Sequence, residues 1–200
     1  MTMVGQTRFR ERAVYGLGAA ALALLVLVAS TLSAAAQQSP AAYMQRVANE
    51  LIAAQRSGSQ ADFARVIRSH ADVPSIAINA LGSYAQSLAK SDRPAYYAGM
   101  VNFIARYAAT EGPKYPVARA VMTGQTKETA SGFFVDSRIT LSSGTSYDVR
   151  WRIVRRGSAF KVRDAEIIGF EMTSFLNTLF QNYISENGGN PRTLVLALNR

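Results

Sequence analysis

The stretch from residue 147 to residue 169 constrains the fold of this chain more than any other. Its first half alternates apolar and polar side chains, with the two-residue period of a half-buried strand. The apolar members are Tyr147, Val149, Trp151 and Ile153. Arg156-Gly157-Ser158 has the composition of a tight turn, and a second extended run begins at Phe160. The pattern predicts an antiparallel hairpin with one apolar face.

The segment after Gly169 has a helical pattern. Apolar residues recur there every three or four positions through Ser185. They are Phe170, Phe175, Leu176, Leu179, Phe180, Tyr183 and Ile184. A hairpin with one apolar face, followed directly by an apolar helix, predicts a sheet whose apolar side is covered by helices.

Four helices are predicted before the strands. Residues 41–56 form an amphipathic helix, and a short second helix follows it. Asp72 starts a third helix as its expected capping residue, and the apolar spacing continues to Leu88. The fourth helix begins near Pro94 and ends at Gly112.

The periodicity changes from helical to extended after Pro116. Four strands are predicted, at residues 117–123, 133–141, 147–154 and 160–169. Short polar joints separate them, the first at Gly124, so that consecutive strands pair antiparallel. A helix over residues 192–198 ends the pattern. The predicted fold class is α+β: four N-terminal helices, a four-stranded antiparallel meander and two C-terminal helices packed around a twisted sheet.

Residues 1–36 have the pattern of a signal peptide. Three arginines precede an apolar run over residues 17–29, which is of signal length and short for a bilayer span. Ala34-x-Ala36 is a small-x-small site, so we expect cleavage after Ala36; an uncleaved anchor is the alternative. The arginines form no Arg-Arg pair, which favours the general secretory route. We expect an exported protein with a single domain over residues 37–200.

Charge and cysteine content narrow the classes of function. The chain has 22 Lys and Arg against 13 Asp and Glu, and it has no cysteine. Residues 1–36 hold three Arg and one Glu, so their removal leaves a net charge of +7. A basic exported domain suits anionic lipid or an acidic protein surface, and export argues against nucleic acid as a partner.

The sequence gives little support to an enzyme. Without cysteine there is neither a thiol nucleophile nor a thiolate metal site. His70 is the single histidine, and we expect it to be a solvated helix-end residue because no Gly-x-Ser-x-Gly elbow accompanies it. The acidic residues show no tight pair, and the chain has no phosphate-loop motif. We predict a noncatalytic protein without a metal or another cofactor.

Several runs of the sequence match the pattern of a known family. The strongest is Tyr-Asp-Val-Arg-Trp-Arg-Ile-Val from Tyr147, a tight turn, Phe-Lys-Val-Arg-Asp, and then Ile-Ile-Gly-Phe before a helix. The N-terminal half adds, in the family's order, Asp72, Leu81-Gly82, Tyr84, Ser91 and Phe103. The chain resembles the MlaC family of periplasmic phospholipid-binding proteins, also called toluene-tolerance or ABC-transporter auxiliary proteins. It departs from the family at Phe160, where Trp is usual, and at Ala71, where Phe is usual.

The resemblance implies a periplasmic phospholipid carrier that holds acyl tails in an apolar cavity between sheet and helices. Its expected partners are an inner-membrane ABC transporter complex and an outer-membrane lipoprotein or porin complex; we expect a monomer whose phospholipid is cargo. The expected lipid-binding residues are Phe133, Val135, Ile139, Val149, Trp151, Phe175, Leu179 and Tyr183. Leu, Ile, Val and Phe linings suit acyl chains, because burying each methylene is worth about 0.8 kcal/mol.

Two alternatives stay open at this point. Periodicity does not distinguish a lined cavity from a filled core, so the chain is either a carrier or a noncatalytic adaptor of the transporter; a carrier or accessory factor for hopanoid-type lipids is a further alternative. The basic strand and turn residues are either a docking surface for an acidic partner or a solvated strand face. These residues are Arg150, Arg152, Arg155 and Arg156.

Overall fold

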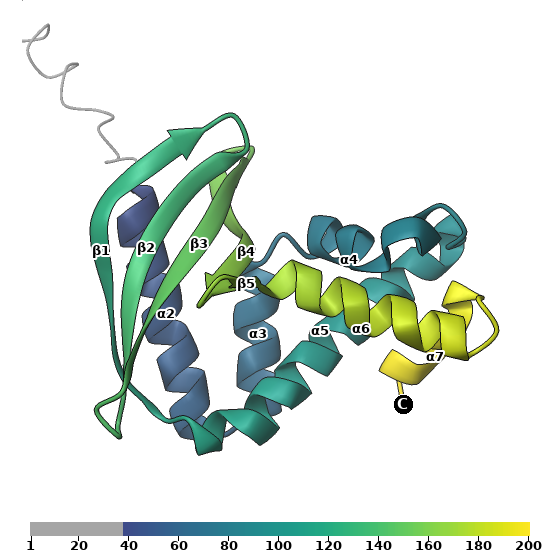
Figure 1. The fold of residues 1–200 in the computed structure, drawn as a ribbon, viewed down its shortest axis with the longest axis horizontal. Helices are drawn as coiled ribbons and strands as arrows, with labels where there is room; N and C mark the ends of the chain where they lie inside the picture. The colour runs from purple at the N-terminus through teal and green to yellow at the C-terminus, as the bar shows by residue number, and fades with distance from the viewer. Residues whose placement is uncertain (1–37) are drawn as a thin grey trace, which may run out of the picture. The chain divides into compact units, whose positions relative to one another are not determined.

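A five-stranded antiparallel sheet, with helices against one of its sides, forms the framework of residues 38–200, which are the residues that the computed structural model describes (Figure 1). These residues form one unit. The expected signal peptide and its cleavage site lie outside the described residues. In the described part, no helix combines the length and the apolar character needed to cross a membrane.

The elements follow the predicted order and confirm the α+β class. The helices are α2 (Pro40–Ser57), α3 (Gln60–His70), α4 (Val73–Leu81), α5 (Arg93–Glu111), α6 (Met172–Glu186) and α7 (Pro191–Leu198), with short 3₁₀ turns η1 (Gly82–Ala85), η2 (Lys90–Asp92) and η3 (Gly112–Lys114). The strands are β1 (Val117–Thr129), β2 (Gly132–Leu141), β3 (Ser146–Arg156), β4 (Ala159–Ile167) and β5 (Phe170–Glu171), adjacent in sequence order. The sheet has five strands rather than four, because the chain turns back after β4 and β5 pairs with it.

The third helix is shorter than predicted. α4 ends at Leu81 because Gly82 adopts φ 53° and ψ −123°, a conformation outside the helical region that glycine tolerates. Leu88 is still buried, but it lies beyond the helix. The capping role expected of Asp72 is also wrong: its side chain makes no capping hydrogen bond and instead pairs with Arg156 and Arg163. Charge-assisted bonds to two guanidinium groups are stronger than one bond to a neutral N–H.

The first hairpin turn lies later than predicted. β1 does not stop at Gly124; it continues to Thr129, with a register shift between Thr123 and Lys127. The turn is made by Ala130 and Ser131, and β2 begins at Gly132. A Cβ atom on Gly132 would collide with the carbonyl oxygen of Ile153. Polar residues inside a long strand therefore mark an irregularity here, not its end.

The strand register places the apolar positions of β2 and β3 on one face. Ile139 lies opposite Tyr147, and Val135 lies opposite Trp151. α2 covers part of this face, and two of its glutamines form hydrogen bonds with the backbone of β1. Gln45 exchanges hydrogen bonds with the backbone at Ala120 and Met122, and Gln55 accepts from the Val117 N–H at 2.8 Å.

The packed core consists of three clusters. One lies between the sheet and α2, a second among α4 to α7, and a third among α2, α3 and α5. The buried members of the first cluster are Tyr43, Met44, Val47, Val135, Ile153 and Phe160. This cluster fills one end of the apolar face of the sheet, the end near the β3–β4 turn.

Candidate functional site

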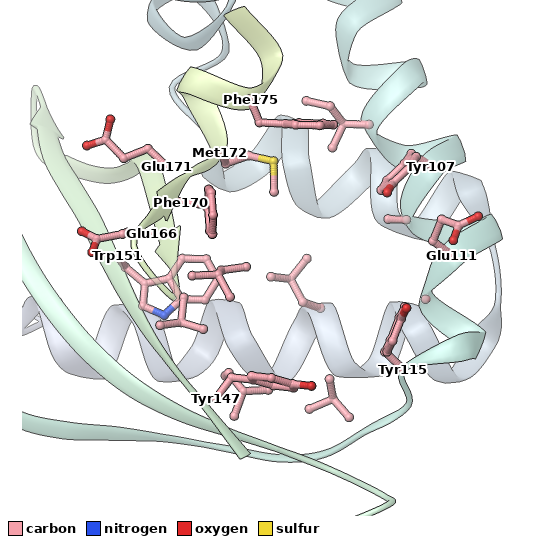
Figure 2. A pocket seen from close by; sticks show the side chains of 18 of the residues that line it. Tyr107, Glu111, Tyr115, Tyr147, Trp151, Glu166, Phe170, Glu171, Met172 and Phe175 are labelled. Atoms are coloured by element: carbon pink, nitrogen blue, oxygen red, sulfur yellow. The ribbon is translucent and has the colours of Figure 1, made fainter. Parts of the chain in front are cut away.

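A large apolar pocket lies at the other end of this face, between the sheet and the helices (Figure 2). Its volume is ≈ 1310 Å³, which exceeds the roughly 300–1,000 Å³ typical of sites for drug-sized ligands. α2, α5 and the first turns of α6 supply the remaining walls. The sheet contributes Ile139, Tyr147, Val149 and Trp151. The pocket has room for extended apolar chains that the protein itself does not fill.

A buried serine positions the tryptophan of this pocket. Ser137 is fully buried on β2, between apolar neighbours of the same face. Its hydroxyl accepts a hydrogen bond from Trp151 Nε1 at 2.8 Å and donates one to the Val149 carbonyl oxygen at 3.2 Å. Because the indole N–H is satisfied by the sheet, the ring presents an apolar surface to the pocket.

An exposed apolar lip borders the pocket where β4 turns into β5 and α6. Phe170 is 78% exposed and Ile168 is 66% exposed, although both are large hydrophobic residues. Ile168 also has φ 53°, a left-handed conformation that is rare for a β-branched side chain. Phe170, Met172 and Phe175 both line the pocket and are exposed, so apolar surface continues from the exterior into the cavity.

The opposite side of the opening is formed by the end of α5 and the segment after it. Figure 2 shows Tyr107, Glu111 and Tyr115 along this side, across from Trp151 and Phe170. Tyr107 and Tyr115 are both more than half exposed. Glu111 forms an ion pair with Lys114 at 2.8 Å.

The structure brings four of the eight predicted lipid-binding residues together in the pocket lining: Ile139, Val149, Trp151 and Phe175. The other four lie elsewhere. Phe133 and Val135 belong to the filled cluster under α2, and Tyr183 packs against the helical cluster. Leu179 is exposed on α6 outside the lining. Strand alternation predicted the face of the sheet on which the pocket lies, but it did not show where along that face the space is filled.

The four predicted docking arginines occupy two places. Arg150 pairs with Asp136 at 2.8 Å on the face of the sheet away from the pocket. Arg152, Arg155 and Arg156 line a second, smaller hollow of ≈ 520 Å³ near the β1–β2 turn, together with Arg163. Arg152 pairs with the buried Asp164 at 3.1 Å. The guanidinium of Arg155 lies 4.5 Å from the ring centroid of Phe160.

Asp72 accepts hydrogen bonds from two arginines of the β3–β4 hairpin. Its side chain is buried, and Arg156 and Arg163 reach the same oxygen at 2.8 and 2.9 Å. Burial alone would raise the pKa of the Asp72 carboxyl, but hydrogen bonds from Arg156 and Ser75 and the charge of Arg163 outweigh it, so that this pKa lies below its ordinary value. The backbone N–H of Asp72 also donates to the Val162 carbonyl oxygen at 2.8 Å. The start of α4 is therefore bound to the sheet edge.

His70 is not the solvated residue that the sequence suggested. Its Nε2 lies 2.9 Å from Glu50 Oε2, and its Nδ1 lies 3.3 Å from the Tyr43 hydroxyl. Tyr43 is buried, and burial is the largest of the effects that raise its pKa to about 12. These groups join α2 to α3 at a distance from the pocket lining. Within residues 38–200, no cluster of three or more His, Cys, Asp or Glu could hold a metal ion.

The predicted lipid-binding residues did not include several that complete the pocket, although Phe170 belonged to the predicted helical pattern and Ile167 to the predicted strand over residues 160–169. Tyr107 and Tyr115 flank the end of α5, and Ile167, Phe170 and Met172 surround the β4–β5 turn. One signal was available: a tight turn at Gly169 is bordered by large apolar residues where polar ones are usual.

The chain was compared with known proteins. The sequence profile of the family described as MlaC protein matches residues 39–200. A phospholipid-binding protein from Ralstonia solanacearum, solved in complex with a phospholipid, has a similar fold, with a TM-score of 0.65 and 17% sequence identity over 80% of this chain and 94% of that one. No curated protein sequence matches. Because the family profile spans nearly all the described residues, the chain belongs to the MlaC family.

Proposed function

We propose that this protein binds phospholipid by placing its acyl tails in the pocket between the sheet and α2, α5 and α6. The observation that carries the proposal is the pocket of ≈ 1310 Å³, whose sheet wall is made of Ile139, Tyr147, Val149 and Trp151. Each methylene that enters such a lining contributes about 0.8 kcal/mol, so the tails alone supply the free energy of binding. The bound phospholipid in the structural relative supports the same use of this fold.

The proposed role is that of a carrier, exported to the periplasm by the general secretory route and cleaved after Ala36. It would move phospholipid between an inner-membrane ABC transporter complex and an outer-membrane lipoprotein or porin complex, and so maintain outer-membrane lipid asymmetry. Membership of the MlaC family supports this assignment. Enclosing the tails removes them from water during transit, so the carrier itself needs neither catalysis nor a cofactor.

The smaller hollow near the β1–β2 turn, which is lined by four arginines, supports docking of the carrier to an acidic partner surface. Arg155 stacks on aromatic rings, and no carboxylate of the described residues pairs with it, so its guanidinium N–H groups remain available to a partner. Arg152 Nε is buried without a hydrogen-bond partner among the described residues. Arg150 lies apart, already paired with Asp136, and belongs to the alternative of a solvated strand face.

The pocket favours a carrier over an adaptor with a filled core. An adaptor with a filled core would leave no space beside Val149, whereas this side chain lines the pocket. A hopanoid-type lipid is a second candidate cargo, because the lining is apolar throughout its centre and the opening is bordered by aromatic residues. Carriers and adaptors differ in one measurable property, which is lipid transfer.

The test is transfer of a fluorescent phospholipid from donor to acceptor vesicles through the mature protein. We expect the rate to rise in proportion to protein concentration, with Phe170→Ser slowing the transfer because the lip loses its most exposed apolar side chain. Leu196→Ser removes another exposed apolar residue, on α7 and outside the pocket, and is the matched control. Protein that binds vesicles without moving lipid would support the adaptor instead.

A further inference from the structure

The polar groups of the pocket are all neutral or acidic. Among the described residues that line it, none is Lys, Arg or His, although the whole chain is strongly basic. Three of the lining residues are Glu111, Glu166 and Glu171. Four arginines line the smaller hollow, and Arg150 lies on the far side of the sheet. An anionic head group at this opening would find no basic side chain in the lining.

Two of the three glutamates already have neighbours unrelated to a ligand. Glu166 lies opposite Arg150 in the β3–β4 register, and Glu171 accepts a hydrogen bond from the Ser174 hydroxyl at 3.1 Å. Figure 2 shows these two carboxylates on the sheet side of the pocket, away from Glu111. Glu111, which pairs with Lys114, is the acid at the α5 side.

The α5 side of the opening combines the groups that recognise an ammonium ion. Tyr107 and Tyr115 offer exposed aromatic faces on either side of Glu111 in the sequence, and all three line the pocket. Aromatic faces with a nearby carboxylate bind alkylammonium groups through cation–π and Coulomb attraction. The Gln55 side chain donates to the carbonyl oxygens of Gly112 and Tyr115 at 2.9 and 3.0 Å, which holds this segment in place.

Lys114 supplies the opposite charge next to this group. Its ammonium contacts both oxygens of Glu111, at 3.0 and 2.8 Å, and it lies outside the pocket lining. The hydrogen bonds that Lys114 donates to Glu111 raise the pKa of Lys114, and the nearby Tyr115 and Tyr107 act in the same direction. The rim thus holds a carboxylate and an ammonium in contact with each other, an arrangement complementary to a zwitterion.

We infer that the Tyr107–Glu111–Tyr115 rim selects lipids whose head group carries an ammonium ion, such as phosphatidylethanolamine, over lipids with an anionic head group, such as phosphatidylglycerol. The inference rests on the proposed function, because the tails must occupy the pocket for the head group to reach this rim. The head-group contact adds selectivity, whereas the apolar lining supplies the affinity.

The test uses delipidated mature protein and vesicles that contain equal amounts of the two lipids with identical acyl chains. Both lipids share one vesicle, so attraction of the basic protein to the vesicle surface affects them alike. Bound lipid is identified by native mass spectrometry. We expect the phosphatidylethanolamine share to exceed that of phosphatidylglycerol about two- to fivefold, since cation–π and exposed ion-pair contacts are weak individually.

Three variants make the result specific. Glu111→Gln should bring the ratio of bound phosphatidylethanolamine to bound phosphatidylglycerol close to the ratio in the vesicle. Lys114→Met should raise this ratio, because the variant lacks the ammonium that neutralises Glu111. Glu128→Gln, at an exposed acid of β1 outside this pocket, should leave the ratio unchanged. Total bound lipid should stay the same in all three. Equal binding of both lipids by the wild type, or an unchanged ratio in Glu111→Gln, would overturn the inference.

A competition experiment with a soluble compound distinguishes a lipid site from a site for a free ammonium compound. Free phosphoethanolamine should not displace bound lipid at millimolar concentration, because it has no tails to bury. Displacement by phosphoethanolamine would contradict the inference and indicate a site for a soluble zwitterion. Protein that takes up neither lipid would refute the proposed function itself. Protein that binds both lipids equally would refute only the head-group selection.

Discussion

Val149 and Ile153 lie four residues apart on the same face of β3, and their surroundings differ. Ile153 is fully buried in the cluster under α2, whereas Val149 lines the pocket. Alternation alone predicts the same environment for both, since it contains no information on how far α2 reaches along the sheet. The role of Ser137, which holds the Trp151 ring, was not predictable from alternation either, because a polar residue interrupts the apolar face at this position.

This difference predicts how each position tolerates a large side chain. In delipidated protein, Val149→Trp should change the free energy of unfolding by less than about 1 kcal/mol, because the indole enters open space, and it should reduce bound lipid. Ile153→Trp is the matched control and should cost about 1–3 kcal/mol or more through overpacking. The measurement is urea unfolding of both variants, beside lipid content by mass spectrometry. Equal losses of stability would mean that protein atoms fill both positions.

At the scale of elements, the sequence predicted helix and strand order well, and it predicted their ends poorly. Helical and extended periods are set by which side chains are buried, so α2, α5 and β2 to β4 were recognisable. The ends of helices and strands depend on tertiary contacts that no local pattern contains. Examples are the pairing of Asp72 with Arg156 and Arg163 and the pairing of β1 with β2 beyond Gly124. The pocket lip was missed for the same reason.

The Asp72 ion pairs predict a dependence of stability on pH. Asp72→Asn should lower the free energy of unfolding at pH 7 by about 3 kcal/mol, because the buried carboxylate that pairs with Arg156 and Arg163 loses its charge. The folded-state pKa of Asp72 is depressed, so its contribution is present above the ordinary value of about 3.9 and is lost as the pH falls through the folded-state pKa. Urea unfolding at pH 7 and at about pH 3 should therefore show that the difference in free energy of unfolding between wild type and variant becomes smaller in acid.

Asp148→Asn is the control for that experiment. Asp148 pairs with Arg138 in full exposure, so its loss should change the stability little at either pH. A gap between wild type and Asp72→Asn that stays constant down to pH 3 would contradict the assignment of the stabilising charge to Asp72.

The turn between β4 and β5 predicts opposite effects on stability and on lipid uptake. Ile168→Asn should raise the free energy of unfolding by about 1 kcal/mol, because asparagine tolerates the left-handed conformation that strains isoleucine. The same change removes an exposed apolar side chain from the lip and should slow uptake of fluorescent phospholipid from vesicles. A variant that is stabilised and also loads lipid at the wild-type rate would show that the lip does not need this side chain.

At the scale of the whole molecule, charge and apolar surface are separated. The basic residues of the described part lie outside the lining of the large pocket, and four arginines gather at the smaller hollow. Docking and cargo binding should therefore respond differently to salt. The α+β class and the apolar face were predictable from the sequence, but this separation depends on the register of β2, β3 and β4 and on the position of α2.

Salt should weaken docking without releasing the cargo. The domain without residues 1–36 carries +7, and exposed contacts are screened within about 10 Å at 0.1 M ionic strength and about 3 Å at 1 M. Binding to vesicles with anionic lipid, measured by flotation, should fall steeply between these two conditions, while lipid already in the pocket stays bound. Vesicle binding that does not change with salt would contradict an electrostatic docking surface.

If the pocket beside Val149 holds phospholipid tails, native mass spectrometry of the exported protein, purified without detergent, should detect the lipid. We expect a species whose added mass is that of a phospholipid, and loss of that species in Val149→Trp while the fold is retained. Wild-type protein that carries no lipid, and that also takes up none from vesicles, would contradict phospholipid binding in this pocket.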